Sequence, residues 1–337
     1  MFLGIEIGGS KLQLGVGPGD GTIVALERAH VDPAAGAEGI RRQILESLPI
    51  VLRSAGTAKH DIRAVGIGFG GPVDANRGIV TKSHQIEGWA GFPLADWSLR
   101  ELGWPTVVHN DADTAGLAEA CFGAGRGYSP IFYITIGSGI GGGLIIDQKI
   151  YRGAGAGAGE IGHLRLPDIY EFSRPLADRE NDTPVLPYIV EERCSGWAMA
   201  HALQRVVSRF AVVQDRDAKQ LIEMVGGRLE NLNCEIIAQA ARLGNALAKE
   251  NLSVTCRILG WAIAQVITLL CPRRVLIGGG VSLIGEDLLF APLRDEVARF
   301  VFPPFADSFE IVQAKLKEAV VVHGALRLAK DSTGSDS

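Results

Sequence analysis

One short pattern, a β-branched apolar run that ends in a Gly/Ser turn, occurs twice in this chain. It reads "IEIGGS" at residues 5–10 and "ITIGSG" at residues 134–139, an offset of 129 from residue 5 to residue 134. In each copy a second apolar strand follows the turn, as in a β-hairpin. The repeat indicates an internal duplication. We therefore expect two α/β domains, each opening with a glycine hairpin.

The order of predicted elements supports an α/β fold. The first third of the chain predicts the order β-β-β-α-β-α, which suggests a mixed sheet and not the strict alternation of a Rossmann fold. These segments are strands at 2–7, 11–16, 22–29, 64–69 and 106–109, and helices at 38–48, ended or kinked by Pro49, and at 112–122. Later helices are expected at 196–210, 234–248, 252–270, 287–300 and 317–329, with a buried strand in "RRVLIGGG".

Composition excludes several classes of protein. The formal charge is −5 without a Lys/Arg cluster, so we expect no nucleic-acid partner. The five cysteines are scattered and odd in number, which indicates reduced thiols in the cytoplasm. The N-terminus lacks a secretion signal. The longest apolar run, residues 258–271, is too short to span a bilayer and predicts a buried helix, so no membrane is expected.

The two hairpins are candidates for anion binding, because glycine turns let backbone N–H groups approach an anion closely. Ser10 and Lys11 add a hydroxyl and a positive charge to the first turn, and Thr135 and Ser138 add hydroxyls to the second. For one Gly-Gly turn alone, an ordinary hairpin is the better interpretation. For a matched pair, a phosphate clamp built from both domains is favoured.

Three further motifs leave alternatives open. Asp111 follows Asn110 where a strand meets a helix, which fits a helix N-cap and a general base equally well. Glu160 and His163 are spaced i, i+3 and form either a surface pair or part of a site, although zinc is not expected without nearby cysteines. The triple glycine of "VLIGGGVSLIG" serves ligand binding or tight packing.

Seven motifs occur in an order that is typical of one family. They are "GIEIGGSK", "GPVD", "NDADTAGLAE", "TIGSGIGGGLI", "GAGEIGH", "SGWAMA" and "VLIGGGVS". Together they resemble the ROK family (repressor, open reading frame, kinase) of bacterial sugar kinases over nearly the whole chain. The resemblance implies an actin/hexokinase-like fold, two ribonuclease-H-like domains with an interdomain cleft. The expected division is 1–113 with the returning helix 315–330, then 114–314, then a disordered tail at 331–337.

The resemblance also implies roles for single residues. Asp111 is expected to be the general base, and Glu6, where most members have Asp, to serve Mg²⁺ through water. The implied sugar ligands are Gly70, Gly71, Asn110, Glu160, His163 and Glu191, with Gln85 in place of the usual Asn. The implied ATP contacts are Gly8, Gly9, Ser10 and Lys11 in the first hairpin, Thr135, Gly137 and Ser138 in the second, and Gly279 and Gly280 at the adenosine.

The chain departs from the family pattern at two further places. Family members commonly carry a cysteine-rich zinc motif after "GEIGH", whereas residues 165–193 contain no cysteine, so we expect no zinc site. That segment is rich in proline and charge and is predicted to be a functional or flexible loop. Asp113 replaces the second Asn of the usual motif. It raises the pKa of Asp111 if both are buried, or it faces solvent.

These expectations converge on a function. The resemblance implies a cytoplasmic, homodimeric kinase that transfers the γ-phosphoryl group of ATP to a hexose, with glucose as the default acceptor. N-acetylhexosamines and fructose stay open as acceptors. A regulatory protein is the alternative of another class. A repressor would carry an N-terminal helix-turn-helix, for which a first strand at residue 2 leaves no room, and a non-catalytic sugar-binding protein would not need Asp111.

Overall fold

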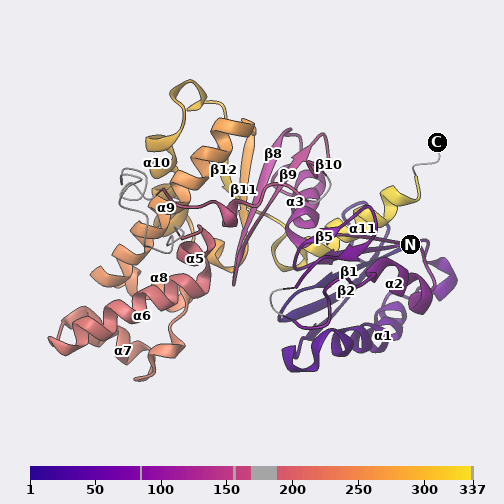
Figure 1. Cartoon of the computed structure of the whole chain (residues 1–337), viewed down its shortest axis with the longest axis horizontal. Coiled ribbons are helices and arrows are strands. Elements are labelled where there is room, and N and C mark those ends of the chain that lie inside the picture. The colour runs from indigo at the N-terminus through magenta and orange to yellow at the C-terminus, as the bar shows by residue number, and fades with distance from the viewer. Residues whose placement is uncertain (84–85, 155–156, 168–187, 335–337) are drawn as a thin grey trace, which may run out of the picture.

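Two five-stranded sheets, one in each half of the molecule, form the framework of this computed structural model (Figure 1). The structure describes residues 1–83, 86–154, 157–167 and 188–334. The first sheet has the order β3-β2-β1-β4-β7 and the second β10-β9-β8-β11-β12. Their strands are β1 Phe2–Ile7, β2 Lys11–Gly17, β3 Ala25–His30, β4 Val65–Phe69, β7 Thr106–Asn110, β8 Ile131–Ile136, β9 Ile140–Ile146, β10 Lys149–Ile150, β11 Arg274–Gly278 and β12 Glu310–Gln313.

The two sheets share one topology. In the first, β1 pairs antiparallel with β2 and parallel with β4, and β4 pairs parallel with β7. In the second, β8 pairs antiparallel with β9 and parallel with β11, and β11 pairs parallel with β12. Each half thus opens with a hairpin and continues with two parallel strands. This correspondence confirms the duplication predicted from the repeated motif.

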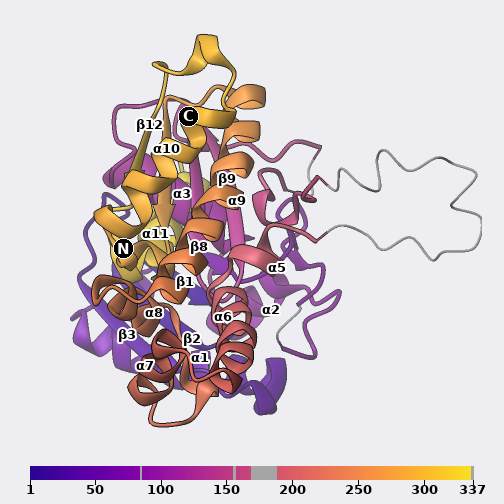
Figure 2. The ribbon, with the colours of Figure 1, turned by 90° about the vertical axis from the view of Figure 1, so that its left-hand side faces the viewer.

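Helices cover the sheets and separate the halves (Figures 1 and 2). They are α1 Gly36–Ser54, α2 Leu94–Leu102, α3 Asp111–Phe122, α5 Glu191–Cys194, α6 Gly196–Val212, α7 Arg216–Met224, α8 Cys234–Arg242, α9 Ala246–Leu270, α10 Ala291–Phe300 and α11 Val320–Ser332. A short hairpin, β5 Val73–Asp74 with β6 Ile79–Val80, lies beside the first sheet. We did not predict α2, β5 or β6 from the sequence.

The last helix, α11, packs on the first sheet although β12 of the second sheet precedes it in the chain. Glycines allow the close approach. A Cβ atom on Gly66 in β4 would lie 1.9 Å from the Ala325 carbonyl oxygen, and one on Gly4 in β1 would lie 2.9 Å from the Val322 carbonyl oxygen. Helix α11 therefore ties the end of the chain to its beginning. On this basis we propose the predicted division into residues 1–113 with 315–330 and residues 114–314.

Helix α9 is the centre of the second core. Along the described residues it is the one helix long and apolar enough to cross a membrane, but 56% of its most apolar window is buried. Its side chains Leu252, Leu259, Ile263 and Ile267 belong to the core cluster of the second half, as expected for a core helix. The helix has 25 residues and begins at Ala246, earlier than the predicted start at residue 252.

Three predicted boundaries were wrong for identifiable reasons. Helix α1 continues through Pro49, since Val51 and Leu52 beyond it are buried in the first core and their burial compensates for the hydrogen bond that proline removes. The break between α8 and α9 lies at residues 243–245, where Asn245 accepts a hydrogen bond from the Ala248 N–H and caps α9. Helix α11 extends to Ser332, into the segment expected to be disordered.

The buried carboxylate of Glu119 on α3 fixes the crossover from β12 to α11. Its Oε1 accepts hydrogen bonds from the backbone N–H groups of Lys315 and Leu316 at 2.8 and 2.7 Å. Its Oε2 accepts one from the Ala124 N–H at 2.7 Å. Three charge-assisted bonds compensate for the burial of the charge. They hold two segments together that lie almost 200 residues apart in the chain.

We predict that Glu119→Gln lowers the free energy of unfolding by about 2 to 3 kcal/mol, because the amide NH₂ group would face a backbone N–H donor and leave it unsatisfied. Urea denaturation measures this difference. Glu101→Gln, an exposed position on α2, is the control and should change the free energy of unfolding by less than about 0.5 kcal/mol. Equal effects of the two substitutions would contradict the role given to Glu119.

Candidate active site between the two halves

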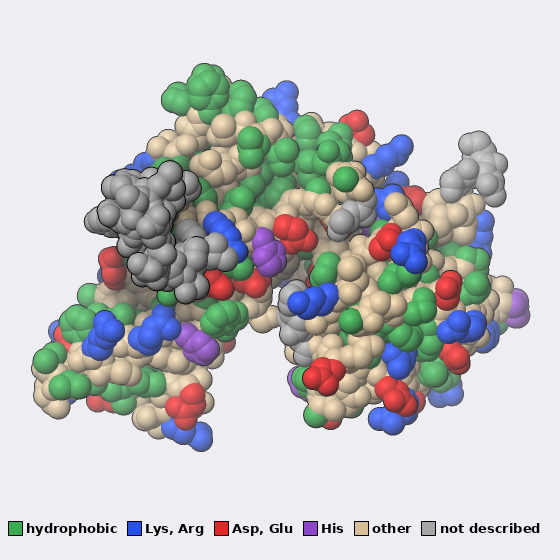
Figure 3. Space-filling view, in the orientation of Figure 1, with side chains coloured by type: hydrophobic (Ala, Val, Ile, Leu, Met, Phe, Trp, Pro, Cys, Tyr) green, Lys and Arg blue, Asp and Glu red, His purple; other side chains and the backbone are tan. Residues whose placement is uncertain are grey.

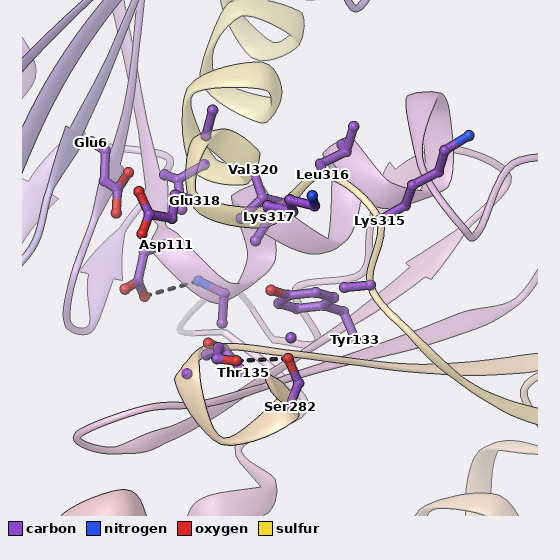
Figure 4. A pocket seen from close by; sticks show the side chains of 18 of the residues that line it. Glu6, Asp111, Tyr133, Thr135, Ser282, Lys315, Leu316, Lys317, Glu318 and Val320 are labelled. Atoms are coloured by element: carbon purple, nitrogen blue, oxygen red, sulfur yellow. Dashed lines mark hydrogen bonds between the residues drawn. The ribbon is translucent and has the colours of Figure 1, made fainter. Parts of the chain in front are cut away.

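A cavity of about 1010 Å³ lies between the two halves. The surface is hollowed there (Figure 3), and Figure 4 shows the side chains that line the cavity. The lining comes from four parts of the chain. They are the first sheet (Glu6, Lys11, Arg28), α3 with the turn after it (Asp111, Ala112, Ala115, Ala124), the second sheet with the turn after β11 (Tyr133, Thr135, Gly278, Gly279, Gly280, Ser282, Leu283) and the crossover, residues 313–321.

The structure brings six of the predicted site residues to this cavity. They are Glu6, Lys11, Asp111, Thr135, Gly279 and Gly280. Others line two small hollows nearby. Gly8, Gly9 and Gly70 lie with Trp89 in one, and Asn110 and Glu160 lie with His109 in the other. Six predicted residues line none of these three hollows within the described residues, and Gln85 lies outside the described residues. The six are Ser10, Gly71, Gly137, Ser138, His163 and Glu191.

The sequence left open whether Asp111 is a helix N-cap or a general base. In the structure Asn110 takes the first role and leaves Asp111 free for the second. Asn110 is the N-cap of α3, and its Oδ1 accepts hydrogen bonds from the N–H groups of Ala112 and Asp113 at 2.8 and 3.2 Å. Its Nδ2 donates to the Gly71 carbonyl oxygen at 3.1 Å. Asp111, the next residue, places its carboxylate in the cavity. Because Asn110 caps the helix, Asp111 is available for chemistry.

Desolvation inside the protein, with a smaller contribution from the negative charge of Glu6, raises the pKa of Asp111 from 3.8 to about 7. A hydrogen bond from the backbone N–H of Ala112, at 2.9 Å, acts in the opposite direction. A carboxylate with a pKa near neutrality holds a proton more readily than an ordinary Asp. Such a value suits a group that must accept a proton near neutral pH.

The carboxylate of Glu6 lies in a network that crosses the first sheet. Its Oε1 pairs with the Lys11 ammonium group at 3.0 Å, and its Oε2 accepts a hydrogen bond from Gln13 Nε2 at 2.6 Å. Arg28 Nε donates to Gln13 Oε1 at 3.0 Å. Burial raises the pKa of Glu6 and the Lys11 charge lowers it. Lys11, predicted to bind phosphate, thus also neutralises Glu6. No sequence motif pointed to Gln13 or Arg28.

A second acidic group lies on the other side of Asp111. Asp113 is buried, so the alternative that it faces solvent was wrong, and its Oδ1 has no hydrogen-bond partner in the described structure. Desolvation raises its pKa from 3.8 to about 8, with further contributions from the charges of Glu160 and Asp111. Arg152 lines the same small hollow and lowers the pKa of Asp113. Asp113 is therefore the protonated neighbour of Asp111 at neutral pH.

His109 and Arg152 line the hollow that holds Asn110 and Glu160. Burial, with a smaller contribution from the Arg152 charge, lowers the pKa of His109 from 6.5 to about 4, so its imidazole is neutral at physiological pH. Its Nδ1 has no hydrogen-bond partner in the described structure. No sequence signal pointed to either residue, because a single His in a strand and a single Arg in a loop are common.

The segment beyond "GEIGH" supports the second hairpin. Glu191 in α5 accepts a hydrogen bond from the Ile140 N–H through its Oε2 at 2.6 Å, at the start of β9. His163 is exposed. No group of three or more His, Cys, Asp or Glu side chains that could hold a metal ion occurs among the described residues. Most of the loop that replaces the usual zinc motif, residues 168–187, lies outside the described residues.

Comparisons with known proteins place this geometry in context. The model of the ROK family matches residues 2–332. The chain is 29% identical over 333 residues to a glucokinase of Thermotoga maritima, with 99% of this chain and 98% of the relative covered. It is 30% identical over 337 residues to a glucokinase of Streptomyces coelicolor, with 98% of each chain covered.

Among solved structures, the chain is similar to a ROK family glucokinase from Streptomyces griseus in complex with glucose and AMPPNP. The TM-score is 0.78 at 29% identity, and the match covers 98% of this chain and 99% of that one. A ROK hexokinase from Thermus thermophilus matches in fold with a TM-score of 0.76 at 23% identity, over 99% of each chain. The two-sheet architecture described above is thus shared along the entire chain.

The Asp113 carboxyl predicts an unusual dependence of stability on pH. Its pKa is about 8 in the folded state, against an ordinary value of 3.8, so the folded state binds this proton more tightly. Its contribution to stability is complete below pH 4 and is lost as the pH rises toward 8. We predict that Asp113→Asn reduces the fall in the free energy of unfolding between pH 5 and pH 8 by about 2 kcal/mol or more.

Urea denaturation of both proteins at pH 5 and pH 8 measures this fall. Asp96→Asn, at an exposed position in the first turn of α2, is the matched control. Its free energy of unfolding should decrease between pH 5 and pH 8 by as much as that of the wild type. An unchanged fall in Asp113→Asn would show that Asp113 does not hold its proton at neutral pH.

Proposed function

The chain belongs to the ROK family and has the actin/hexokinase-like fold, and from this premise we propose that it is an ATP-dependent glucokinase. It would transfer the γ-phosphoryl group of ATP to a hydroxyl of glucose. The observation that carries the proposal is the position of Asp111, a carboxylate with a pKa of about 7 in the cavity between the two halves. Two relatives that are 29% and 30% identical over nearly the full length of the chain carry the name glucokinase, and this supports glucose as the acceptor.

In the proposed reaction, Asp111 accepts the proton of a sugar hydroxyl while the hydroxyl oxygen attacks the γ-phosphorus. The bond between the γ-phosphorus and the bridging oxygen of ATP breaks, and ADP leaves with the electron pair. Catalysis of this transfer rests on positioning and electrostatics. The backbone fixes Asp111 at the first residue of α3, directly after the cap residue Asn110, so its carboxylate is preorganised for this role.

The nucleotide is proposed to occupy the large cavity. Thr135 and Lys11 line it from the two hairpins, and Gly279 and Gly280 line it at the end of β11. Hydroxyl, ammonium and glycine backbone groups are suitable partners for phosphates. We keep the predicted phosphate roles of Gly8, Gly9, Ser10, Gly137 and Ser138 as part of the proposal, in their two turns.

The sugar is proposed to bind beside Asp111, on the side of the small hollows. Asn110 and Glu160 line one of them, and Gly70 lines the other. Amide, carboxylate and backbone carbonyl groups bind sugar hydroxyls by hydrogen bonds. The proposed sugar ligands are therefore those implied by the resemblance, Gly70, Gly71, Gln85, Asn110, Glu160, His163 and Glu191. The proposal extends to a cytoplasmic homodimer without nucleic-acid or membrane partners.

Mg²⁺ fits the carboxylates of the cavity. The ion binds to proteins through one or two carboxylates together with substrate phosphates and water, and Glu6 and Asp111 both line the cavity. We propose that Glu6 serves Mg²⁺ through water, since its Oε1 and Oε2 already contact Lys11 and Gln13. When bound with ATP, the ion neutralises charge on the phosphates.

The function is tested by measuring ADP release with Mg-ATP and a panel of glucose, fructose, mannose, N-acetylglucosamine and N-acetylmannosamine. We expect glucose to give the highest kcat/KM. We predict that Asp111→Asn lowers kcat by at least about 100-fold, because an amide does not accept the proton. Glucose binding, measured by calorimetry, should persist in the variant. Failure of the wild-type protein to phosphorylate any of these sugars would contradict the proposed kinase activity. Full activity of Asp111→Asn would contradict the role of Asp111 as the general base.

The role of Asp111 as the general base also predicts how kcat/KM depends on pH. Asp111 acts only when deprotonated, so kcat/KM for glucose should rise as the pH increases through about 7, the pKa of Asp111, and then level off. Steady-state rates from pH 5.5 to 8.5 measure the profile. A rate that stays constant over this range would show that the titration of Asp111 does not limit the reaction.

We predict that Glu6→Gln raises the Mg²⁺ concentration required for half-maximal rate by about tenfold, because the substitution removes a charge that attracts the hydrated ion. The rate at fixed ATP and varied Mg²⁺ measures this change. Glu27→Gln, in β3 of the same sheet, is the control and should keep the wild-type Mg²⁺ requirement. An unchanged requirement in Glu6→Gln would make Glu6 a structural residue only.

A further inference from the structure

Lys317 has a backbone conformation that lysine rarely adopts. Its φ is +55°, in the left-handed region, where a non-glycine residue is uncommon. The described residues contain four other non-glycine residues with positive φ, Asp147, Gln148, Gln214 and Cys271. Of these five, Lys317 is the one that lines the cavity between the two halves. Backbone strain at a cavity is a starting point for a functional hypothesis.

The neighbours of Lys317 hold the strained conformation in place on both sides. Before it, the Glu119 carboxylate fixes the N–H groups of Lys315 and Leu316. After it, the Glu318 carbonyl oxygen accepts hydrogen bonds from Gln13 Nε2 at 2.9 Å and Lys11 Nζ at 3.1 Å. Strained residues persist where the surrounding structure over-determines them. The crossover is therefore anchored to α3 and to the first hairpin, with Lys317 between the two anchors.

The Lys317 ammonium group differs from the other cations of the cavity. The cationic side chains that line it are Lys11, Arg28, Lys315 and Lys317. Lys11 pairs with Glu6, and Arg28 donates to Gln13. The side chain of Lys315 extends away from Glu6 and Asp111 (Figure 4). Among the described residues the Lys317 side chain has no hydrogen bond or ion pair, so its charge is available.

The surroundings of Lys317 favour an anion. Ala319 and Val320, at the start of α11, line the same cavity, and the N-terminus of a helix carries a partial positive charge. Thr135 and the glycines at residues 278–280 face the cavity from the second sheet. An ammonium group, a helix N-terminus and hydroxyl donors around one cavity form a suitable environment for a chain of phosphates.

We propose that Lys317 is a third phosphate-binding element of this site, in addition to the two hairpins, and that it binds the triphosphate chain of the nucleotide. This inference rests on the proposed function, because it takes ATP to be the ligand of the cavity. Neither the repeated hairpin nor any motif that led to the family includes residue 317. The lysine occupies a position where glycine would be free of strain, which indicates that its side chain, and not its backbone, is what the site uses.

The decisive variant is Lys317→Gly, because the inference predicts opposite effects on stability and on binding. Glycine adopts the left-handed conformation without strain, so the melting temperature should stay the same or rise. Loss of the ammonium group should raise the dissociation constant of ADP and the KM for ATP about five- to tenfold, with the KM for glucose unchanged. Calorimetric titration with ADP and steady-state kinetics measure these quantities.

Two further variants separate charge from backbone. Lys317→Met keeps the strain and removes the charge, so it should weaken ADP binding as much as Lys317→Gly does. Lys317→Arg keeps the charge and should keep affinity within about twofold of the wild type. Gln214→Gly is the matched control, because Gln214 has a φ of +60° at an exposed position before α7. It should relieve strain and leave ADP binding unchanged.

Ionic strength gives a readout that a purely structural role would not change. Salt screens an exposed charge, so the dissociation constant of ADP should rise with salt more steeply in the wild type than in Lys317→Gly. Equal ADP affinity in the wild type, Lys317→Gly and Lys317→Met would overturn the inference and leave the proposed kinase intact. A wild-type protein that binds neither ADP nor ATP would overturn the proposed function and this inference together.

Discussion

The close contact between α11 and the first sheet is the constraint on which the remaining architecture depends. A helix approaches a sheet this closely only where side chains are absent, and Gly4 and Gly66 supply that space on neighbouring strands. Gly324 allows α11 to approach α3 as closely, because a Cβ atom there would lie 1.9 Å from the Thr114 carbonyl oxygen of α3. Since β12 belongs to the second sheet, the chain must cross between the halves, and the crossover becomes a wall of the cavity.

The electrostatics of the site follow from how each buried carboxylate is compensated. Glu6 has a cation and an amide within hydrogen-bond distance, Asp111 has backbone N–H groups, and Asp113 has an oxygen without a partner. Of the two aspartates, Asp111 with its N–H donors has the lower pKa, about 7, and Asp113 has a pKa of about 8. Environments that separate the pKa values of neighbouring acids are typical of sites that transfer protons. Asp113 thus keeps a second negative charge away from the base at neutral pH.

The features predicted from the sequence depend on neighbouring residues. The features that were missed depend on contacts between residues far apart in the chain. The duplicated hairpins, the strand before Asn110 and the two-domain fold follow from periodicity, glycine turns and motif order. Glu119 carried no such signal, because its partners at residues 315 and 316 are almost 200 positions away. Pro49 misled the prediction since burial of the residues beyond it outweighs a local rule. Lys317 was not predicted as a site residue, because lysine rarely adopts the left-handed backbone conformation and nothing in the neighbouring sequence indicates it.

The duplication explains why the two hairpins have equivalent places and different chemistry. Both turns follow the first strand of a sheet with the same pairing order, so symmetry of the fold brings them to opposite sides of one cleft. The first copy contributes charged side chains to the cavity, Glu6 and Lys11, whereas the second contributes the hydroxyl of Thr135. Charge concentrated on one side orients a charged ligand, and neutral donors on the other side contact it without adding repulsion. A symmetric scaffold therefore holds an asymmetric ligand, and the crossover from β12 to α11 closes the remaining wall.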